Sequence, residues 1–432
     1  MICENISVSS EGHLLFAGQD TVELAKKYGT PLYLMDEDRI RANCRLYKKA
    51  MKESFGDDAA PLYASKANCF KRIYEIMKEE DMGIDVVSSG EIYTAVKAGY
   101  DLSKAFFHSN NKTDEDIAYA MDNGIGYFVA DNIEEVKAVD KEAEKRGFRQ
   151  KIILRLTPGI DPHTYEAIST GQVDSKFGSA IETGQAEEIT VAAMGYPNVD
   201  LRGFHCHVGS QVFAEDVFER AAVVMLEFVA EMKEKHGFVT KVLDLGGGYG
   251  VRYVESDPHL DIAEKISQVA KVVKDTCAKL GLDMPEIHME PGRSIVADAG
   301  MVLYTVGTVK KIAGYKNYVS IDGGMTDSPR YALYKAAYTC LTANKMNEKA
   351  DFKASLVGRC CESGDIIQED VMFPESITRY DTVAVCTAGA YHYSMASNYN
   401  RLPKPATVML RGGESYIAVK RETFEDVARN DV

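Results

Sequence analysis

Several features of other protein classes are missing from this sequence of 432 residues. It has no run of about 18 or more apolar residues, so we expect no transmembrane helix. Its first residues lack a basic stretch followed by an apolar one, which argues against a secretory signal. Basic side chains are in deficit: 50 Lys and Arg against 65 Asp and Glu give a formal charge of −15. This argues against nucleic acid or an anionic membrane as a partner.

The nine cysteines include no Cys-x-x-Cys pair, which is the spacing typical of zinc and redox sites. Reduced thiols in a cytoplasmic protein are the simplest interpretation. The sequence also has no short repeat, low-complexity run or Pro-rich linker. Its length exceeds that of one ordinary core and predicts two domains.

Short apolar runs alternate with charged, helix-like stretches over most of the chain. The predicted strands are Pro61–Ser65, Ile84–Ser88, Ala105–His108, Tyr127–Ala130, Lys151–Leu156, Arg202–Val208, Val242–Leu245 and Glu286–Glu290. The predicted helices include Lys71–Glu80, Gly90–Ala98, Glu115–Asn123, Ile133–Arg146, Ala214–Lys235 and Asp261–Lys279. Eight strand–helix units predict a (β/α)₈ TIM barrel, and the count favours it over a doubly wound open sheet.

A barrel of this kind carries its active-site residues at the C-terminal ends of the strands. Polar and glycine positions fall there in this sequence. They are Lys66, Ser88–Gly90, His108–Asn110, Asp131, Arg155, His207, Gly246–Gly250, and Glu290 with Arg293. The strands are predicted from their apolar residues alone, yet reactive residues follow at their C-terminal ends.

The pattern changes after Arg293, where strands follow one another without long helices. The predicted strands are Val302–Lys310, Asn317–Asp322, Ala354–Val357, Tyr380–Thr387, Thr407–Arg411 and Ser415–Val419. They predict a C-terminal antiparallel β domain, to which His13–Phe16 and Leu32–Met35 add N-terminal strands. We expect a barrel domain at 36–297 and a second domain formed by 1–35 and 298–432.

Lys66 and the two histidines of His205-Cys206-His207 each allow more than one interpretation. A lysine at a partly desolvated strand end can serve as a nucleophilic amine, or it can simply leave the strand for solvent. His205 and His207 lie on one side of a strand. They can bind a metal, stack on a flat cofactor or be buried structural residues. A metal needs further ligands, and only His108 and Asp131 offer themselves.

Two motifs follow the last predicted barrel strands. Consecutive glycines in Gly246–Gly250 let backbone N–H groups converge on a phosphate, and barrels often bind phosphate after strands seven and eight. Tight turns use the same residues. Glu290 can pair with a protonated pyridine nitrogen, and Arg293 can reach a phosphate, although the two can also form a structural ion pair. Together with Lys66 and His207, these groups match what pyridoxal phosphate requires.

The chain resembles the diaminopimelate decarboxylases, which belong to the alanine-racemase-like, fold type III pyridoxal phosphate enzymes. The matching stretches are Tyr63–Ala67, Asp85–Glu91, Asp174–Gly178, His205–Gln211, Gly246–Gly250, Glu290–Arg293, Cys361–Asp365 and Gly389–Asn400. Several are shared with ornithine and arginine decarboxylases. The Asp174–Gly178, Cys361–Asp365 and Gly389–Asn400 stretches point more narrowly to the diaminopimelate enzymes.

The resemblance implies a role for each site residue. The catalytic pair is Lys66, which forms a Schiff base with pyridoxal 5'-phosphate, and Cys361, which donates a proton. The cofactor-binding set is Lys66, His207, Ser210, Gly247, Gly248, Glu290, Gly292, Arg293 and Tyr391. The substrate-binding set is Arg293, Arg330, Tyr334, Glu362 and Tyr391. In this family Cys361 and Glu362 come from the partner subunit of a head-to-tail homodimer.

The implied reaction is decarboxylation of meso-2,6-diaminopimelate to L-lysine and CO₂. Arg330 and Glu362 match the carboxylate and amine at the distal end of that substrate, whereas lysine would leave the arginine unpaired. One departure is Tyr331, where the family has proline. The alternatives are a decarboxylase of the same fold acting on D-ornithine, D-lysine or carboxynorspermidine, a racemase, a non-catalytic cofactor carrier and a metal-dependent hydrolase.

Overall fold

A computed structural model describes residues 1–161, 174–214 and 216–432. The chain divides into two compact units. The barrel unit comprises residues 43–250 and 260–292, and the β unit comprises 1–42, 251–259 and 293–432. The domain limits expected from the sequence, 36 and 297, stay a prediction. Within the described residues, no helix combines the length and apolar character needed to cross a membrane.

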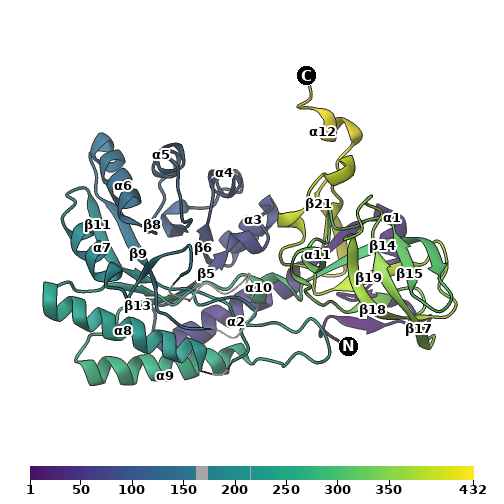
Figure 1. Cartoon of the computed structure of the whole chain (residues 1–432), viewed down its shortest axis with the longest axis horizontal. Coiled ribbons are helices and arrows are strands. Elements are labelled where there is room, and N and C mark those ends of the chain that lie inside the picture. Colours follow the sequence, from purple (N-terminus) through teal and green to yellow (C-terminus); the bar gives the residue numbers. More distant parts are fainter. Residues whose placement is uncertain (162–173, 215) are drawn as a thin grey trace. The chain divides into compact units, whose positions relative to one another are not determined.

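The barrel unit contains a closed ring of parallel strands (Figure 1). In spatial order they are β5 (Ala60–Ala64), β6 (Gly83–Val86), β7 (Ala105–Phe107), β8 (Tyr127–Ala130), β9 (Gln150–Thr157), β11 (Val199–His205), β12 (Val242–Asp244) and β13 (Glu286–Met289). Pairing of β13 with β5 closes the ring. The predicted barrel and its strands are confirmed, and a two-residue strand, β10 (Ser179–Ala180), adds to the edge of β9.

Helices follow the barrel strands along the chain. They are α3 (Lys71–Glu79), α4 (Ser89–Lys97), α5 (Asp114–Asp122), α6 (Ile133–Arg146), α7 (Gln185–Met194), α8 (Val217–His236) and α9 (Ile262–Leu280), while α2 (Glu37–Phe55) precedes β5. The six predicted helices are confirmed to within a few residues, and residue 215 of one predicted range lies outside the described residues. Helix α7 was not predicted from the sequence.

Local signals explain where these helices begin and end. Thr113 and Asp116 form a reciprocal capping box at the start of α5, which satisfies N–H groups that have no partner inside the helix. Asp261 caps the N-terminus of α9, and Gly281 ends it in the left-handed conformation, with φ of 65°. On α3 the stripe formed by Ile73, Ile76 and Met77 is fully buried.

The β unit holds a mixed sheet. Its main path is β18 (Ile366–Pro374), β17 (Ala350–Val357), β15 (Asn317–Ile321), β14 (Gly300–Lys311), β4 (Leu32–Asp36), β20 (Ala406–Arg411) and β21 (Glu414–Val419), and β19 (Thr382–Cys386) pairs with β14 and β16 (Cys340–Thr342). The expected N-terminal contribution is confirmed, because β4 lies between β14 and β20.

The sheet differs from the expected one in three respects. β4 pairs with β20, and β15 with β17, in parallel, so the sheet is only mostly antiparallel. β16 and β18 were not predicted from the sequence. The predicted strand at 13–16 is β2 (Leu14–Phe16), and it forms a separate small sheet with β1 (Ile6–Val8) and β3 (Gln19–Asp20).

Candidate active site

Most polar positions expected at a barrel rim lie at or just beyond the carboxyl end of their strand, whereas Arg155 lies inside β9, before its last two residues. Lys66 lies in a short 3₁₀ turn, η1 (Ser65–Ala67), directly after β5. It is exposed, while its neighbours Ser65 and Ala67 are buried. The turn therefore presents an amine at the rim and anchors the backbone on both sides of it.

Glu290, just after β13, forms the centre of a buried polar cluster. Its Oε2 atom lies 3.1 Å from Nε2 of His205, in a hydrogen bond. Its Oε1 atom lies 2.6 Å from Nε2 of His108, without hydrogen-bond geometry. The two imidazole rings meet edge to face, with centroids 4.8 Å apart. All three side chains are almost fully buried.

The charge state of this cluster follows from burial and proximity. Burial alone would raise the pKa of Glu290, but His108 and His205 outweigh it and lower that pKa well below its usual range. Burial lowers the pKa of His108 to about 4 and also lowers that of His205, against the opposing effect of Glu290. Near neutral pH the glutamate is therefore a carboxylate held by the two histidines.

Two further buried carboxyl groups lie beside Glu290, and neither was predicted from the sequence as a site residue. Asp85 lies on β6 and Asp244 on β12. Burial, reinforced by the Glu290 charge, raises the pKa of both well above the usual range. A single aspartate inside an apolar run, as in Ile84-Asp-Val and Leu243-Asp-Leu, was the signal that could have identified them.

The glycine loop after β12 packs tightly on its neighbours. Gly248 has a φ of 120°, and a Cβ atom there would lie 2.0 Å from the carbonyl oxygen of Gly209. A Cβ on Gly247 would lie 1.9 Å from the carbonyl oxygen of Glu290. The backbone of Gly248 also accepts a hydrogen bond from the N–H of Val212 at 2.9 Å. Only glycine allows the two loops to approach this closely.

Three predicted cofactor residues adjoin this loop or the lysine turn. His207 accepts a hydrogen bond on Nδ1 from the N–H of Gly247 at 3.2 Å, and burial lowers the pKa of His207 well below its usual range. Ser210 lies in the loop that Gly248 packs against, and its side chain is half-buried. A Cβ on Gly292 would lie 2.8 Å from that of Ala64, next to the Lys66 turn.

In the β unit, two arginines contact the same tyrosine ring. The guanidinium carbons of Arg293 and Arg330 lie 4.8 Å and 5.0 Å from the centroid of Tyr391. Arg293 donates a hydrogen bond to the Tyr253 hydroxyl at 2.7 Å, and Arg330 lies 5.3 Å from the Tyr334 ring. Both arginines are buried. Nε of Arg330 is buried and has no hydrogen-bond partner among the described residues.

Cys361 and Glu362 stand apart from this cluster on the surface of the chain. Both are exposed. The backbone N–H of Cys361 donates to Oδ1 of Asn400 at 2.7 Å, and the Tyr399 hydroxyl lies 3.5 Å from Oε2 of Glu362. The loop is therefore held in place while both side chains face outward.

The barrel residues fit pyridoxal 5'-phosphate. Glu290 is a buried, ionised carboxylate, the type of group that pairs with a protonated pyridine nitrogen. The Gly246–Gly250 loop brings its backbone against the Gly209–Val212 segment, as a phosphate cradle requires. His108, His205 and Glu290 also have the donor types of a metal site, with ligand atoms within 4.8 Å of one another. Direct contacts between the histidines and the carboxylate account for this grouping.

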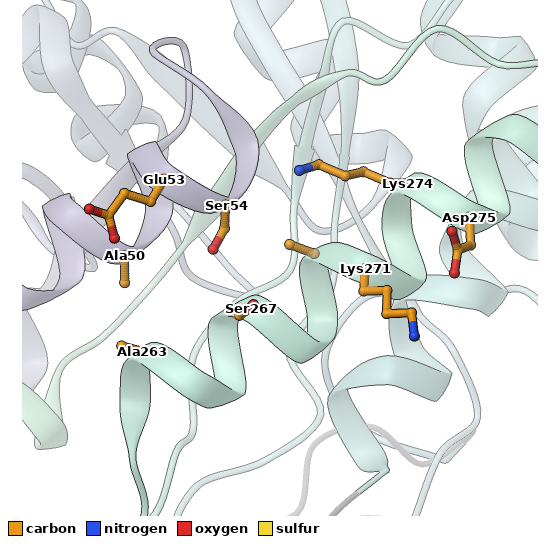
Figure 2. Close-up of a pocket in the computed structure, with 9 residues that line it drawn as sticks. Ala50, Glu53, Ser54, Ala263, Ser267, Lys271, Lys274 and Asp275 are labelled. Atoms are coloured by element: carbon orange, nitrogen blue, oxygen red, sulfur yellow. The ribbon is translucent and has the colours of Figure 1, made fainter.

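A groove on the barrel unit lies away from all these residues. It has a volume of about 410 Å³ and runs between α2 and α9. Figure 2 shows Glu53 and Ser54 of α2 together with Ser267, Lys271, Lys274 and Asp275 of α9 along it. Charges of both signs line it, and none of the predicted site residues does.

Known proteins share this architecture. Residues 37–297 match the family described as pyridoxal-dependent decarboxylase, pyridoxal binding domain. The diaminopimelate decarboxylase of Bacillus subtilis (strain 168) is 43% identical over 98% of this chain and 96% of its own. That of Staphylococcus aureus (strain COL) is 42% identical over 99% of each. The crystal structure of the M. jannaschii enzyme in complex with L-lysine superposes with a TM-score of 0.91 at 31% identity, over 100% of this chain and 98% of that one. The chain therefore belongs to the pyridoxal-dependent decarboxylases and, within them, to the diaminopimelate decarboxylase family.

Proposed function

We propose that the protein decarboxylates meso-2,6-diaminopimelate to L-lysine and CO₂ with pyridoxal 5'-phosphate, in the last step of lysine biosynthesis. The observation that carries the proposal is the similarity to diaminopimelate decarboxylases over nearly the whole chain, at 42–43% identity. Decarboxylases of the same fold that act on other amino acids are the alternative, but the relatives of comparable similarity do not favour it.

When bound, pyridoxal phosphate supplies an electron sink for the charge left by loss of CO₂. In this proposal, Lys66 would hold the cofactor covalently through its side-chain amine. Glu290, kept ionised by His108 and His205, holds a proton on the ring nitrogen. His207 stacks on the ring, and Ser210, Gly247 and Gly248 bind the phosphate. Gly292 and Arg293 assist from the segment that follows β13.

We assign recognition of the substrate to the arginine cluster of the β unit. Arg293, Arg330 and Tyr334 bind carboxylate, and Tyr391 contacts both substrate and cofactor. The unpartnered Nε of Arg330 supports this assignment, because a buried N–H group without an acceptor is costly unless a ligand accepts its hydrogen bond. A substrate that lacks the distal carboxylate would leave that cost in place, which favours diaminopimelate over lysine.

We further propose that the protein is a homodimer in which each subunit completes the site of its partner. Cys361 would donate the proton that replaces CO₂, and Glu362 would contact the distal amine. Both side chains are exposed on the single chain, which supports a role across an interface. The nine cysteines are all free, which supports a reducing, cytoplasmic location.

The direct test is CO₂ release from meso-diaminopimelate by the purified protein, with L-lysine identified as the product. Borohydride reduction followed by peptide mapping should place the cofactor on Lys66. Bound cofactor with activity only on D-ornithine, D-lysine or carboxynorspermidine would transfer the assignment to another substrate. Failure to bind the cofactor would refute the proposal.

A further inference from the structure

The helix that carries Arg330 and Tyr334 is too short to be stable by itself. α11 (Arg330–Tyr334) has five residues, whereas isolated helices below roughly 12 residues are marginal in water. Its orientation, and with it the direction of the Arg330 guanidinium, must therefore be set by contacts with the surrounding sheet.

Tyr331 supplies one such contact. Its ring is buried, with 8% of the residue exposed, and its hydroxyl donates a hydrogen bond to Oε2 of Glu369 at 2.5 Å. The other carboxylate oxygen of Glu369 accepts from Nζ of Lys316 at 2.6 Å. Glu369 lies on β18 and Lys316 immediately precedes β15. The phenol thus joins α11 to an ion pair that spans two strand segments.

The electrostatics of this contact agree with its geometry. Hydrogen bonds from Lys316 and Tyr331 lower the pKa of Glu369, so the acceptor is ionised. Burial, with the charge of Glu369, raises the pKa of Tyr331 to about 12, so the donor keeps its proton. A hydrogen bond to a charged acceptor is stronger than one between neutral groups.

The segment is tied to β18 a second time beyond the helix. Tyr338 donates its backbone N–H to Oε1 of Gln368 at 2.8 Å. The Gln368 amide in turn donates to the carbonyl of Glu369 at 3.0 Å. Between the two ties, the Lys335 ammonium lies 4.8 Å from the centroid of the Tyr331 ring. Both ends of the segment are therefore held against one strand.

We infer that Tyr331 and Glu369 are positioning residues that set Arg330 and Tyr334 for the distal carboxylate of the substrate. The inference rests on the proposed function. Tyr331 restrains the helix through a side-chain hydrogen bond to an ionised acceptor on β18.

The test compares Y331F and E369L with wild-type holoenzyme. Y331F keeps the buried ring and removes only the hydroxyl. Loss of this hydrogen bond should raise KM for diaminopimelate roughly threefold to tenfold, with kcat and cofactor affinity within about twofold. E369Q retains an acceptor and should lie between wild type and E369L. Both single variants remove the same hydrogen bond. The KM of the Y331F/E369L double variant should therefore not exceed that of the single variant with the higher KM.

Tyr315 provides a matched control, since it is 90% exposed and Y315F should leave KM unchanged. Thermal melting of every variant distinguishes positioning from a purely structural role. A lower melting temperature with unchanged KM would overturn the inference, as would a loss of kcat with unchanged KM. Absence of diaminopimelate activity in the wild type would instead refute the proposed function.

Discussion

The guanidinium carbon of Arg330 lies 5.0 Å from the centre of the Tyr391 ring. Arg293 lies at a similar distance from the same ring, and Tyr391 itself adopts a left-handed backbone conformation, with φ of 61°. A bulky residue rarely adopts this conformation without support. The two cation–π contacts supply such support, so the tyrosine and the two arginines form one contact group.

Changing Arg330 to Ala should lower kcat/KM for diaminopimelate roughly a hundredfold, because a buried charge-assisted pair with the substrate carboxylate is lost. Cofactor affinity, measured by fluorescence titration, should change by less than about twofold. R330K is the matched variant and should recover only part of the activity, since lysine lacks the planar fork of arginine. Equal loss of activity and of cofactor binding would contradict the role assigned to Arg330.

Replacing His205 with Ala should destabilise the ionised form of Glu290, since the hydrogen bond from a buried N–H donor is lost. We expect kcat to fall roughly tenfold or more. Cofactor labelled with ¹⁵N in the ring should report a less protonated nitrogen by NMR. His236 offers a control, because it pairs with Glu187 at 2.8 Å near the surface and H236A should alter neither quantity. An unchanged ¹⁵N shift in H205A would contradict the role given to this histidine.

Substituting Gly248 with Ala should abolish high-affinity cofactor binding, because the new Cβ would meet the Gly209 carbonyl at 2.0 Å. Gly147 also has a positive φ, 71°, but a Cβ added there would meet no atom within 4 Å. G147A should therefore cost only about 1 kcal/mol of stability and keep the cofactor. Cofactor titration and thermal melting of both variants check this, and normal cofactor affinity in G248A would remove the loop from the phosphate site.

Mixing two inactive variants tests the shared site. K66A and C361A homodimers should each be inactive. Subunit exchange should restore up to about a quarter of wild-type activity, since half of the dimers are then mixed and each holds one intact site. A mixture of K66A with the double variant K66A/C361A provides the control and should stay inactive. No recovery after exchange verified by mass spectrometry would place Cys361 and Lys66 in the same subunit.

The stability of the β unit should depend on the ionisation of Asp327. Burial raises the pKa of this carboxyl from 3.8 to about 6, so the native state holds a proton that the unfolded chain has already released. The contribution of the group is fully present below pH 3.8 and is lost as pH rises through 6. D327N cannot ionise and should gain up to about 3 kcal/mol relative to wild type between pH 4 and 7. Urea unfolding at both pH values measures this difference, and a pH-independent difference would contradict it.

Hydrophobic patterning was sufficient to predict the barrel. Each of its main strands is a short apolar run with the helix-forming signals placed after it, so local sequence and tertiary structure agree. β18 was missed because three consecutive polar residues, Gln368–Asp370, interrupt its apolar run. The parallel pairing of β4 with β20 could not be predicted, since nothing local encodes a contact between strands so far apart in the chain.

The rim residues were predicted for a different reason, namely that barrel geometry brings strand ends together. Patterning could not show that His108 and His205 share a single carboxylate, because that contact joins three separate strand ends. The same limit applies to Tyr331. The sequence showed only that a proline was missing, and the acceptor of its hydrogen bond lies 38 residues away on another element.

The position of β4 in the sheet also has a consequence for how the chain is made. β4 ends at residue 36, yet its two neighbours begin only at residues 300 and 406. The ribosome therefore releases this strand, all of whose residues are buried in the finished protein, long before either partner exists. The barrel sequence can fold as it emerges, whereas the sheet must wait for almost the last strand to be synthesised. A nascent chain stalled before residue 406 would carry a complete barrel sequence beside a sheet that lacks one flank of β4.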